Sequence, residues 1–118
     1  MGIPFYTADT GSIYTHDVSG TDDTASKNAG YGITALDAVT TGDSNTALGY
    51  NTLTANLAGD RNTAVGTSAL KSNTTGITNV AVGSSALESN TTANSNTAVG
   101  HASSYLLNSG ASNVSVGY

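Results

Sequence analysis

The chain has 118 residues, a formal net charge of −5, and neither Cys nor Trp. Only 9% of its residues are charged, against about 25% in ordinary soluble domains, and half of the chain is Gly, Ser, Thr or Asn. Three basic residues are too few for binding a phosphate backbone, so we expect no nucleic-acid partner. The lack of Cys excludes disulfides and thiolate metal sites. No apolar run has the length of a membrane span, so we expect no membrane insertion.

Residues 1–27 differ in composition from the rest of the chain. They contain the only Pro, the only Phe and half of the acidic residues. Two interpretations stay open for this segment. One is a cap over the structure that follows, and the other is an attachment arm that docks on a partner protein through apolar and aromatic anchors. The candidate anchors are Ile3, Phe5, Tyr6, Ile13 and Tyr14. The first residues lack the basic and apolar regions of a signal peptide, so we expect synthesis in a cytoplasm.

Residues 28–118 repeat with a constant period of seventeen, without insertion or deletion. An Asn recurs six times, and a Gly follows each Asn four positions later. A Leu recurs in four of the units, and a second Gly marks most of the turns. The Asn positions are Asn28, Asn45, Asn62, Asn79, Asn96 and Asn113, and the Leu positions are Leu36, Leu53, Leu70 and Leu87.

Each unit starts with a short alternating segment, as in Asn62-Thr63-Ala64-Val65-Gly66. Alternation with β-branched residues, closed by Gly, is typical of a strand, and the Asn- and Thr-rich remainder is typical of turns. We expect Thr63 and Val65 to point into the structure and Ala64 to point out. The Leu that follows the turn is the second expected inward anchor. The predicted repeat core is therefore Leu48, Val65, Val82, Val99 and Val116, together with Leu53, Leu70 and Leu87.

A unit of this length cannot bury a core alone, so the repeat predicts an all-β fold in which the units stack as coils of a β-solenoid. Neighbouring strands in such a stack lie about 4.8 Å apart, and identical Asn side chains can bond from coil to coil. The expected core is thin, which makes an isolated chain marginally stable. A row of small residues that we expect on the outside suits the close approach of a second chain. We therefore predict a homotrimer with contacts at Ala47, Ala64, Ala81 and Ala98.

The units Asn62–Leu70 and Asn96–Gly100 resemble the repeats of bacteriophage tail-fibre and related virion-surface proteins. They are more distantly similar to the head repeats of trimeric autotransporter adhesins. The resemblance implies a trimeric, left-handed β-solenoid exposed on a virion or cell surface, and we expect a virion surface, with synthesis in the host cytoplasm. The short chain favours a head decoration (cement) protein that binds the major capsid protein and stabilises the capsid. The alternatives are a tail-fibre or receptor-binding tip, which contacts other tail proteins and a host surface receptor, and a surface adhesin.

No set of residues indicates catalysis or a cofactor. Glycan-cleaving enzymes need two carboxylates at a set separation, whereas Asp43 and Asp60 share one turn position of the repeat, where stacked acids are typically solvated. His16 and His101 lack a second ligand at metal spacing. The pair Asp22 and Asp23 lacks the spacing of a calcium loop, and calcium binding stays open. The apolar stretch 105–107 and Tyr118 have two interpretations, a cap on the last coil or a receptor contact.

Overall fold

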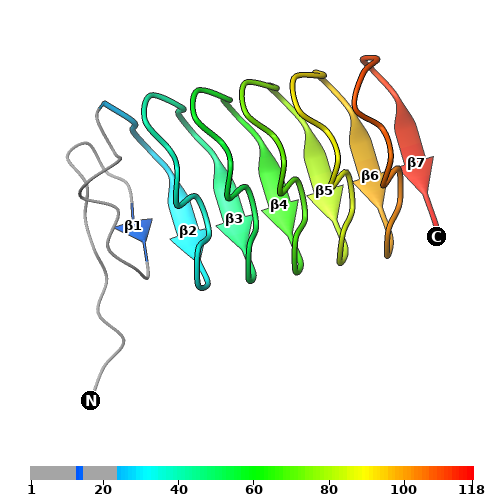
Figure 1. Ribbon diagram of the computed structural model, residues 1–118, viewed down its shortest axis with the longest axis horizontal. Helices are drawn as coiled ribbons and strands as arrows, with labels where there is room; N and C mark the ends of the chain where they lie inside the picture. Colours follow the sequence, from blue (N-terminus) through cyan, green and yellow to red (C-terminus); the bar gives the residue numbers. More distant parts are fainter. Residues whose placement is uncertain (1–12, 15–23) are drawn as a thin grey trace.

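The computed structural model describes residues 13–14 and 24–118, which coil into one parallel β-solenoid (Figure 1). Each strand pairs in parallel with the next strand of the chain, so the strands form one sheet in sequence order. The prediction of an all-β solenoid with one repeat unit per coil is confirmed. The strands are β1 (Ile13–Tyr14), β2 (Ala29–Tyr31), β3 (Thr46–Leu48), β4 (Thr63–Val65), β5 (Val80–Val82), β6 (Thr97–Val99) and β7 (Val114–Val116).

The pairing of neighbouring strands shows that the constant spacing of the repeat begins at β2. Thr63 of β4 pairs with Val80 of β5, and Val80 pairs with Thr97 of β6, so each turn of the coil has the length of one repeat unit. The first turn is one residue shorter, because Ile13 of β1 pairs with Ala29 of β2. The strand β1 therefore extends the sheet on the N-terminal side of the first repeat Asn.

The corners of the coil are made by residues with positive φ, and most of them are not glycine. In the unit that starts at Asn62, φ is 121° at Gly66, 60° at Ser68, 50° at Leu70 and 57° at Thr78. A non-glycine residue in this region is strained by about 1–2 kcal/mol. Hydrogen bonds between coils offset the strain, because the N–H of Ser68 donates to Tyr50 O of the preceding coil at 2.9 Å and that of Leu70 donates to Ala86 O of the next coil at 3.0 Å.

The glycine at the end of each strand is required by the stacking of the backbones. Gly66 has a φ of 121°, and a Cβ built on it would lie 2.7 Å from the carbonyl carbon of Gly83 in the next coil. A real Cβ does not approach a carbonyl carbon so closely. Any larger residue at this corner would push the coils apart, so the spacing of the stack fixes this position of the repeat as Gly.

The interior of the coil is lined by rows of small and medium side chains. Leu53, Leu70 and Leu87 are fully buried, as predicted, and Leu36 continues their row. The alanines that we expected at a trimer contact are buried as well, so that prediction is wrong. The interior must hold a Leu and an Asn from each coil, which leaves room only for a methyl group on the strand side. The buried alanines are Ala47, Ala64, Ala81 and Ala98.

The predicted strand contribution to the core is also wrong, for the same reason. Leu48 is 46% exposed, Val99 is 38% exposed and Val116 is 78% exposed, while Val82 is exposed and Val65 is partly buried. The alternation along each strand was predicted correctly, but its two sides were exchanged. The β-branched residues form the outer face of the sheet, where their shape suits a pleated surface.

The predicted Asn ladder is confirmed and holds neighbouring coils together. Asn62 donates through Nδ2 to Gly76 O at 2.8 Å, and its Oδ1 accepts the backbone N–H of Asn79 in the next coil at 2.9 Å. The same pair of bonds recurs at Asn45 and Asn79. Because these amides are buried, their hydrogen bonds satisfy backbone groups that water cannot reach.

A second ladder, which we did not predict, runs along another corner of the interior. It consists of Asn56, Asn73 and Asn90, all fully buried. Asn73 donates to the Oδ1 of Asn56 at 2.8 Å, and Asn90 donates to the Oδ1 of Asn73 at 2.8 Å. Val39 occupies the same place before this ladder and Leu107 the place after it. The row is therefore polar in the middle of the stack and apolar at both ends.

Candidate interaction surface

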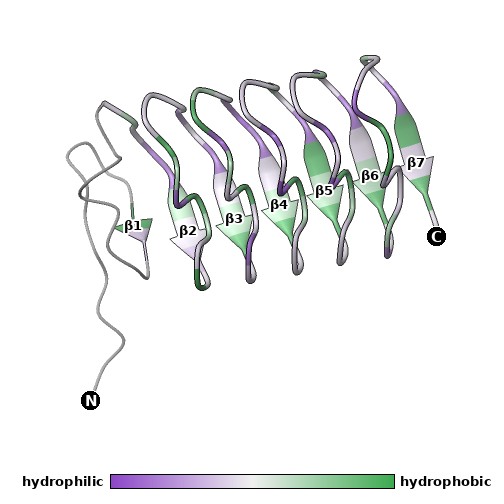
Figure 2. Ribbon diagram, in the orientation of Figure 1, coloured by the Kyte–Doolittle hydropathy of each residue, from purple (hydrophilic) through white to green (hydrophobic). Residues whose placement is uncertain are grey.

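The outer face of the sheet consists of two rows of uncharged side chains. The first outer row is Ile13, Ala29, Thr46, Thr63, Val80, Thr97 and Val114, and the second outer row is Tyr31, Leu48, Val65, Val82, Val99 and Val116. Hydrophobic colour recurs along the row of strands, and the segments that lead into the strands are hydrophilic (Figure 2). The face is regular because each coil contributes one residue to each row.

Every strand of this face except β4 exposes a large apolar side chain. The exposed large apolar members of the rows are Ile13, Tyr31, Leu48, Val82, Val99, Val114 and Val116. Ile33 and Tyr50 are exposed just after strands β2 and β3. Monomeric proteins rarely leave a continuous apolar surface in water, and such a surface marks an interaction site. The outer face of the sheet is therefore the candidate interaction surface.

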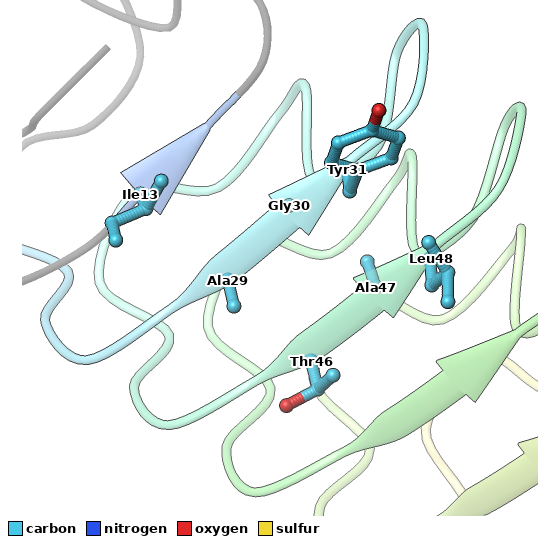
Figure 3. A pocket seen from close by; sticks show the side chains of 7 residues that line it. All are labelled: Ile13, Ala29, Gly30, Tyr31, Thr46, Ala47 and Leu48. Carbon is cyan, nitrogen blue, oxygen red and sulfur yellow. The ribbon is translucent and has the colours of Figure 1, made fainter. Parts of the chain in front are cut away.

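This face is hollowed at its N-terminal end, where strands β1, β2 and β3 meet (Figure 3). The hollow has a volume of about 260 Å³ and is lined by Ile13, Ala29, Gly30, Tyr31, Thr46, Ala47 and Leu48. Ala29 is the smallest residue of the first outer row. The hollow arises because a methyl group stands where the neighbouring coils have Ile or Thr.

The residues proposed for an attachment arm have different outcomes. Ile3, Phe5 and Tyr6 lie outside the described residues, and Ile13 is exposed at the edge of the hollow. Tyr14 is fully buried, so its prediction as a partner anchor is wrong. It pairs with Gly30 at the start of the Ala row, and a Cβ on Gly30 would lie 2.9 Å from the Tyr14 ring. Tyr14 therefore fills the N-terminal end of the interior.

The acidic side chains of the turn form a ladder like that of the asparagines. The Oδ1 of Asp43 accepts the backbone N–H of Ser26 at 2.8 Å, and the Oδ1 of Asp60 accepts that of Asp43 at 2.9 Å. Asn94 makes the equivalent bond with Ile77 at 2.8 Å. At this corner, a carboxylate oxygen of Asp and an amide oxygen of Asn therefore accept the same kind of hydrogen bond, which joins one coil to the preceding coil.

The remaining residues singled out from the sequence are scattered. The ring of His101 lies 5.4 Å from that of Tyr118, whereas His16, Asp22 and Asp23 lie outside the described residues. Over residues 13–14 and 24–118, no three His, Cys, Asp or Glu side chains are grouped to hold a metal ion. In the stretch 105–107, Tyr105 and Leu106 are exposed and Leu107 packs against the core.

Comparisons with known proteins add no relative. No family, curated protein or solved structure matches the chain. The described part of the chain also contains no helix that is long and apolar enough to cross a membrane. The functional proposal therefore depends on the repeat, the fold and the outer face of the sheet.

Sequence reasoning missed this outer face, although the repeat contained a signal for it. The first outer row ranges in size from Ala to Ile and the second from Val to Tyr, whereas the Asn row has no exception in six units. Side chains in a close-packed interior must keep their volume from coil to coil. In the strand segment, the inner Asn and Ala rows keep their size over most of the stack, whereas the outer rows change in size, most of all at their N-terminal end.

Proposed function

We propose that the chain is a non-enzymatic structural protein of a bacteriophage virion that acts as a homotrimer. In this proposal it decorates the head, where it binds the major capsid protein and stabilises the capsid. The observation that carries the proposal is the uncharged and largely apolar outer face of a solenoid whose coils are joined by hydrogen-bonded ladders. The resemblance of the repeats to virion-surface proteins supports the virion setting and a left-handed coil.

The chemistry of the outer face favours a second copy of the chain as its occupant. Each copy has a net charge of −5, so two copies repel each other wherever their acidic turns meet. Neither outer row contains a charged residue, so contact through this face avoids that repulsion. Burial of apolar surface contributes about 25 cal/mol per Å². Copies related by rotation would bring Val82 and Val99 of each chain toward a common axis.

A structural role also agrees with how the acids are used. Asp43 and Asp60 accept backbone N–H groups of a neighbouring coil, and these bonds stabilise the stack. In the decoration proposal, the stiff trimer projects from the shell, and Ile3, Phe5 and Tyr6 contact the capsid. Three such contacts per trimer would join neighbouring capsid subunits, and binding to the intact shell raises its stability by mass action.

The association of copies is tested by adding one negative charge to the outer face. Light scattering or native mass spectrometry of the unchanged chain should give the mass of three chains. Val82→Asp should give folded monomers, because a carboxylate would be buried at the contact. Thr75→Asp is the matched control, since Thr75 is exposed at a bend between strands and its substitution should leave the trimer intact. An unchanged chain that stays monomeric at all concentrations would contradict the proposal.

Decoration is tested with capsids that lack the protein. Saturable binding of the full chain and a higher temperature of capsid disruption are expected, and both should be lost in the variant with Phe5→Ser and Tyr6→Ser. The same substitutions should leave the trimer assembled, because neither residue belongs to the outer rows. If the intact chain fails to bind capsids and binds host cells, the protein is a tail-fibre or receptor-binding component.

A further inference from the structure

The N-terminal end of the outer face carries both its largest side chain and its hollow. Tyr31 is 48% exposed and is followed in the second outer row by Leu48 and then by Val in every later coil. Ala29 lies on the same strand, two residues earlier, and leaves the first outer row short of side-chain volume (Figure 3). The strand β2 therefore carries both the largest side chain of the outer face, Tyr31, and its smallest, Ala29.

The hollow suits an aromatic ring. Its volume is about 260 Å³, and in another protein an apolar cavity of about 150 Å³ holds a benzene molecule. Its lining is apolar, with Ile13 and Leu48 on two sides and the chain's own Tyr31 beside them. A tyrosine matches such a site, because its ring is apolar and its hydroxyl group bonds to a polar neighbour or to water.

On the basis of the self-association proposed above, we propose that Tyr31 of one copy inserts into the hollow of the neighbouring copy. Copies related by rotation about an axis along the stack hold their β2 strands at one level. Each copy then offers its Tyr31 to one neighbour and its hollow to the other. The occupant of the hollow is a second copy of this chain, and the contact is repeated around the axis.

This contact gives the assembly a register that the repeat alone does not provide. The rows from Val65 onward are nearly the same in each coil, so two copies could slip by one coil, about 4.8 Å, and keep similar contacts. A copy slipped by one coil would place Tyr31 at the level of Thr46 and Leu48, where Thr46 has the side-chain volume that Ala29 lacks. Tyr31 and the hollow therefore distinguish the aligned arrangement from its slipped competitors by a steric penalty on the latter.

Cross-linking between full-length chains tests the contact directly. The chain has no Cys, so each introduced thiol has a known position. Chains with Tyr31→Cys are mixed with tagged chains carrying Ala29→Cys and treated with a short bismaleimide, whose length replaces that of the missing ring. A cross-link between the two kinds of chain is expected, because sheets that pack face to face lie about 10 Å apart, beyond the reach of a direct disulfide. Cross-links that join only chains of the Tyr31→Cys kind to one another, with none between the two kinds, would overturn the proposal.

Filling the hollow tests the contact without new thiols. Ala29→Val restores the β-branched side chain of other coils, and we expect it to raise the concentration of half-assembly about tenfold or more, as Tyr31→Ala should. The two substitutions together should be no worse than either alone, because they remove one contact. Thr63→Val, in the same row beyond the hollow, is the control and should change assembly little.

The outcomes separate this contact from the assembly on which it rests. An unchanged chain that stays monomeric defeats the proposed trimer. A trimer in which Ala29→Val and Tyr31→Ala have no effect, or have effects that add, defeats the Tyr31 contact alone. Mixing Ala29→Cys chains with Phe5→Cys chains tests a different occupant. A bismaleimide cross-link formed there, in place of one with the Tyr31→Cys chain, would assign the hollow to the N-terminal segment and overturn the proposal.

Discussion

The inner and outer sides of the sheet show opposite patterns across the repeat. On the inner side, Asn recurs without exception from Asn28 to Asn113, and the Ala row keeps Ala from Ala47 to Ala98. On the outer side, the residue that follows each Asn varies from Ala29 to Val80. The inner side is constant because stacked coils leave a fixed width between them. Within the strand segment, constancy of size, more than hydrophobicity, therefore identifies the side that faces the interior.

Removing one inner Asn should have the largest effect. Asn62→Ala deletes the acceptor of the Asn79 backbone N–H and the donor to Gly76 O, bonds of 2.9 and 2.8 Å. The N–H of Asn79 would then be buried without a partner. We expect the free energy of unfolding to fall by about 2–4 kcal/mol. Denaturant unfolding followed by circular dichroism measures it, at one fixed chain concentration because assembly also contributes to stability.

The matched control for this change is Asn108→Ala. Asn108 is exposed in the loop that leads to β7, so its substitution should alter the free energy of unfolding by no more than about 0.5 kcal/mol. Equal losses at Asn62 and Asn108 would show that the buried ladder contributes no more than a surface amide, and the account of the inner side would be wrong.

Enlarging one inner and one outer side chain of β4 tests which side of the sheet faces the interior. Ala64→Leu adds three carbons inside the coil, where Ala64 is fully buried, and overpacking of this kind costs about 1–3 kcal/mol. Val65→Leu enlarges the next residue along the strand, on the outer face, where Leu48 already occupies the equivalent place. We expect a clear fall in the midpoint of denaturant unfolding only for Ala64→Leu. A larger fall for Val65→Leu would reverse the assignment of the two sides.

Much of the fold could be predicted because the repeat is strict. The period sets the coil length, the Gly after each strand marks the corner, and Leu70 and its equivalents lie inside as expected. The direction of the strand side chains was predicted wrongly, since Thr63-Ala64-Val65 alternates equally well in both senses. Hydrophobicity favoured Val inside, but the width of the coil admits only Ala there.

The hollow in the candidate surface could not be predicted, for reasons that lie outside the repeat. The hollow depends on the pairing of Ile13 with Ala29 across a turn that is one residue shorter than the repeat unit. Tyr14 looks like a docking residue in the sequence, because nothing there shows that Gly30 leaves space for its ring. The second ladder was missed because only Asn56, Asn73 and Asn90 belong to it.

The end of that second ladder gives the smallest expected effect and tests whether the inner side needs Asn there. The Oδ1 of Asn90 is buried without a hydrogen-bond partner, because the next coil has Leu107 at the place of the following Asn. Leu107→Asn would supply a donor to this oxygen. A net hydrogen bond contributes about 0.5–1.5 kcal/mol, and the loss of a partly buried Leu offsets part of it. We expect the free energy of unfolding to rise by less than about 1 kcal/mol.

Leu106→Asn is the control for this last change, because Leu106 is exposed beside Leu107 and an amide there cannot extend the ladder inside the coil. Its effect should be near zero, so a gain confined to Leu107→Asn would show that the ladder continues by one rung. Amide hydrogen exchange tests for the added hydrogen bond, because the backbone N–H groups of Asn90 and its neighbours should then exchange more slowly. A loss of stability in Leu107→Asn would mean that apolar packing matters more than the orphaned oxygen at this end of the stack.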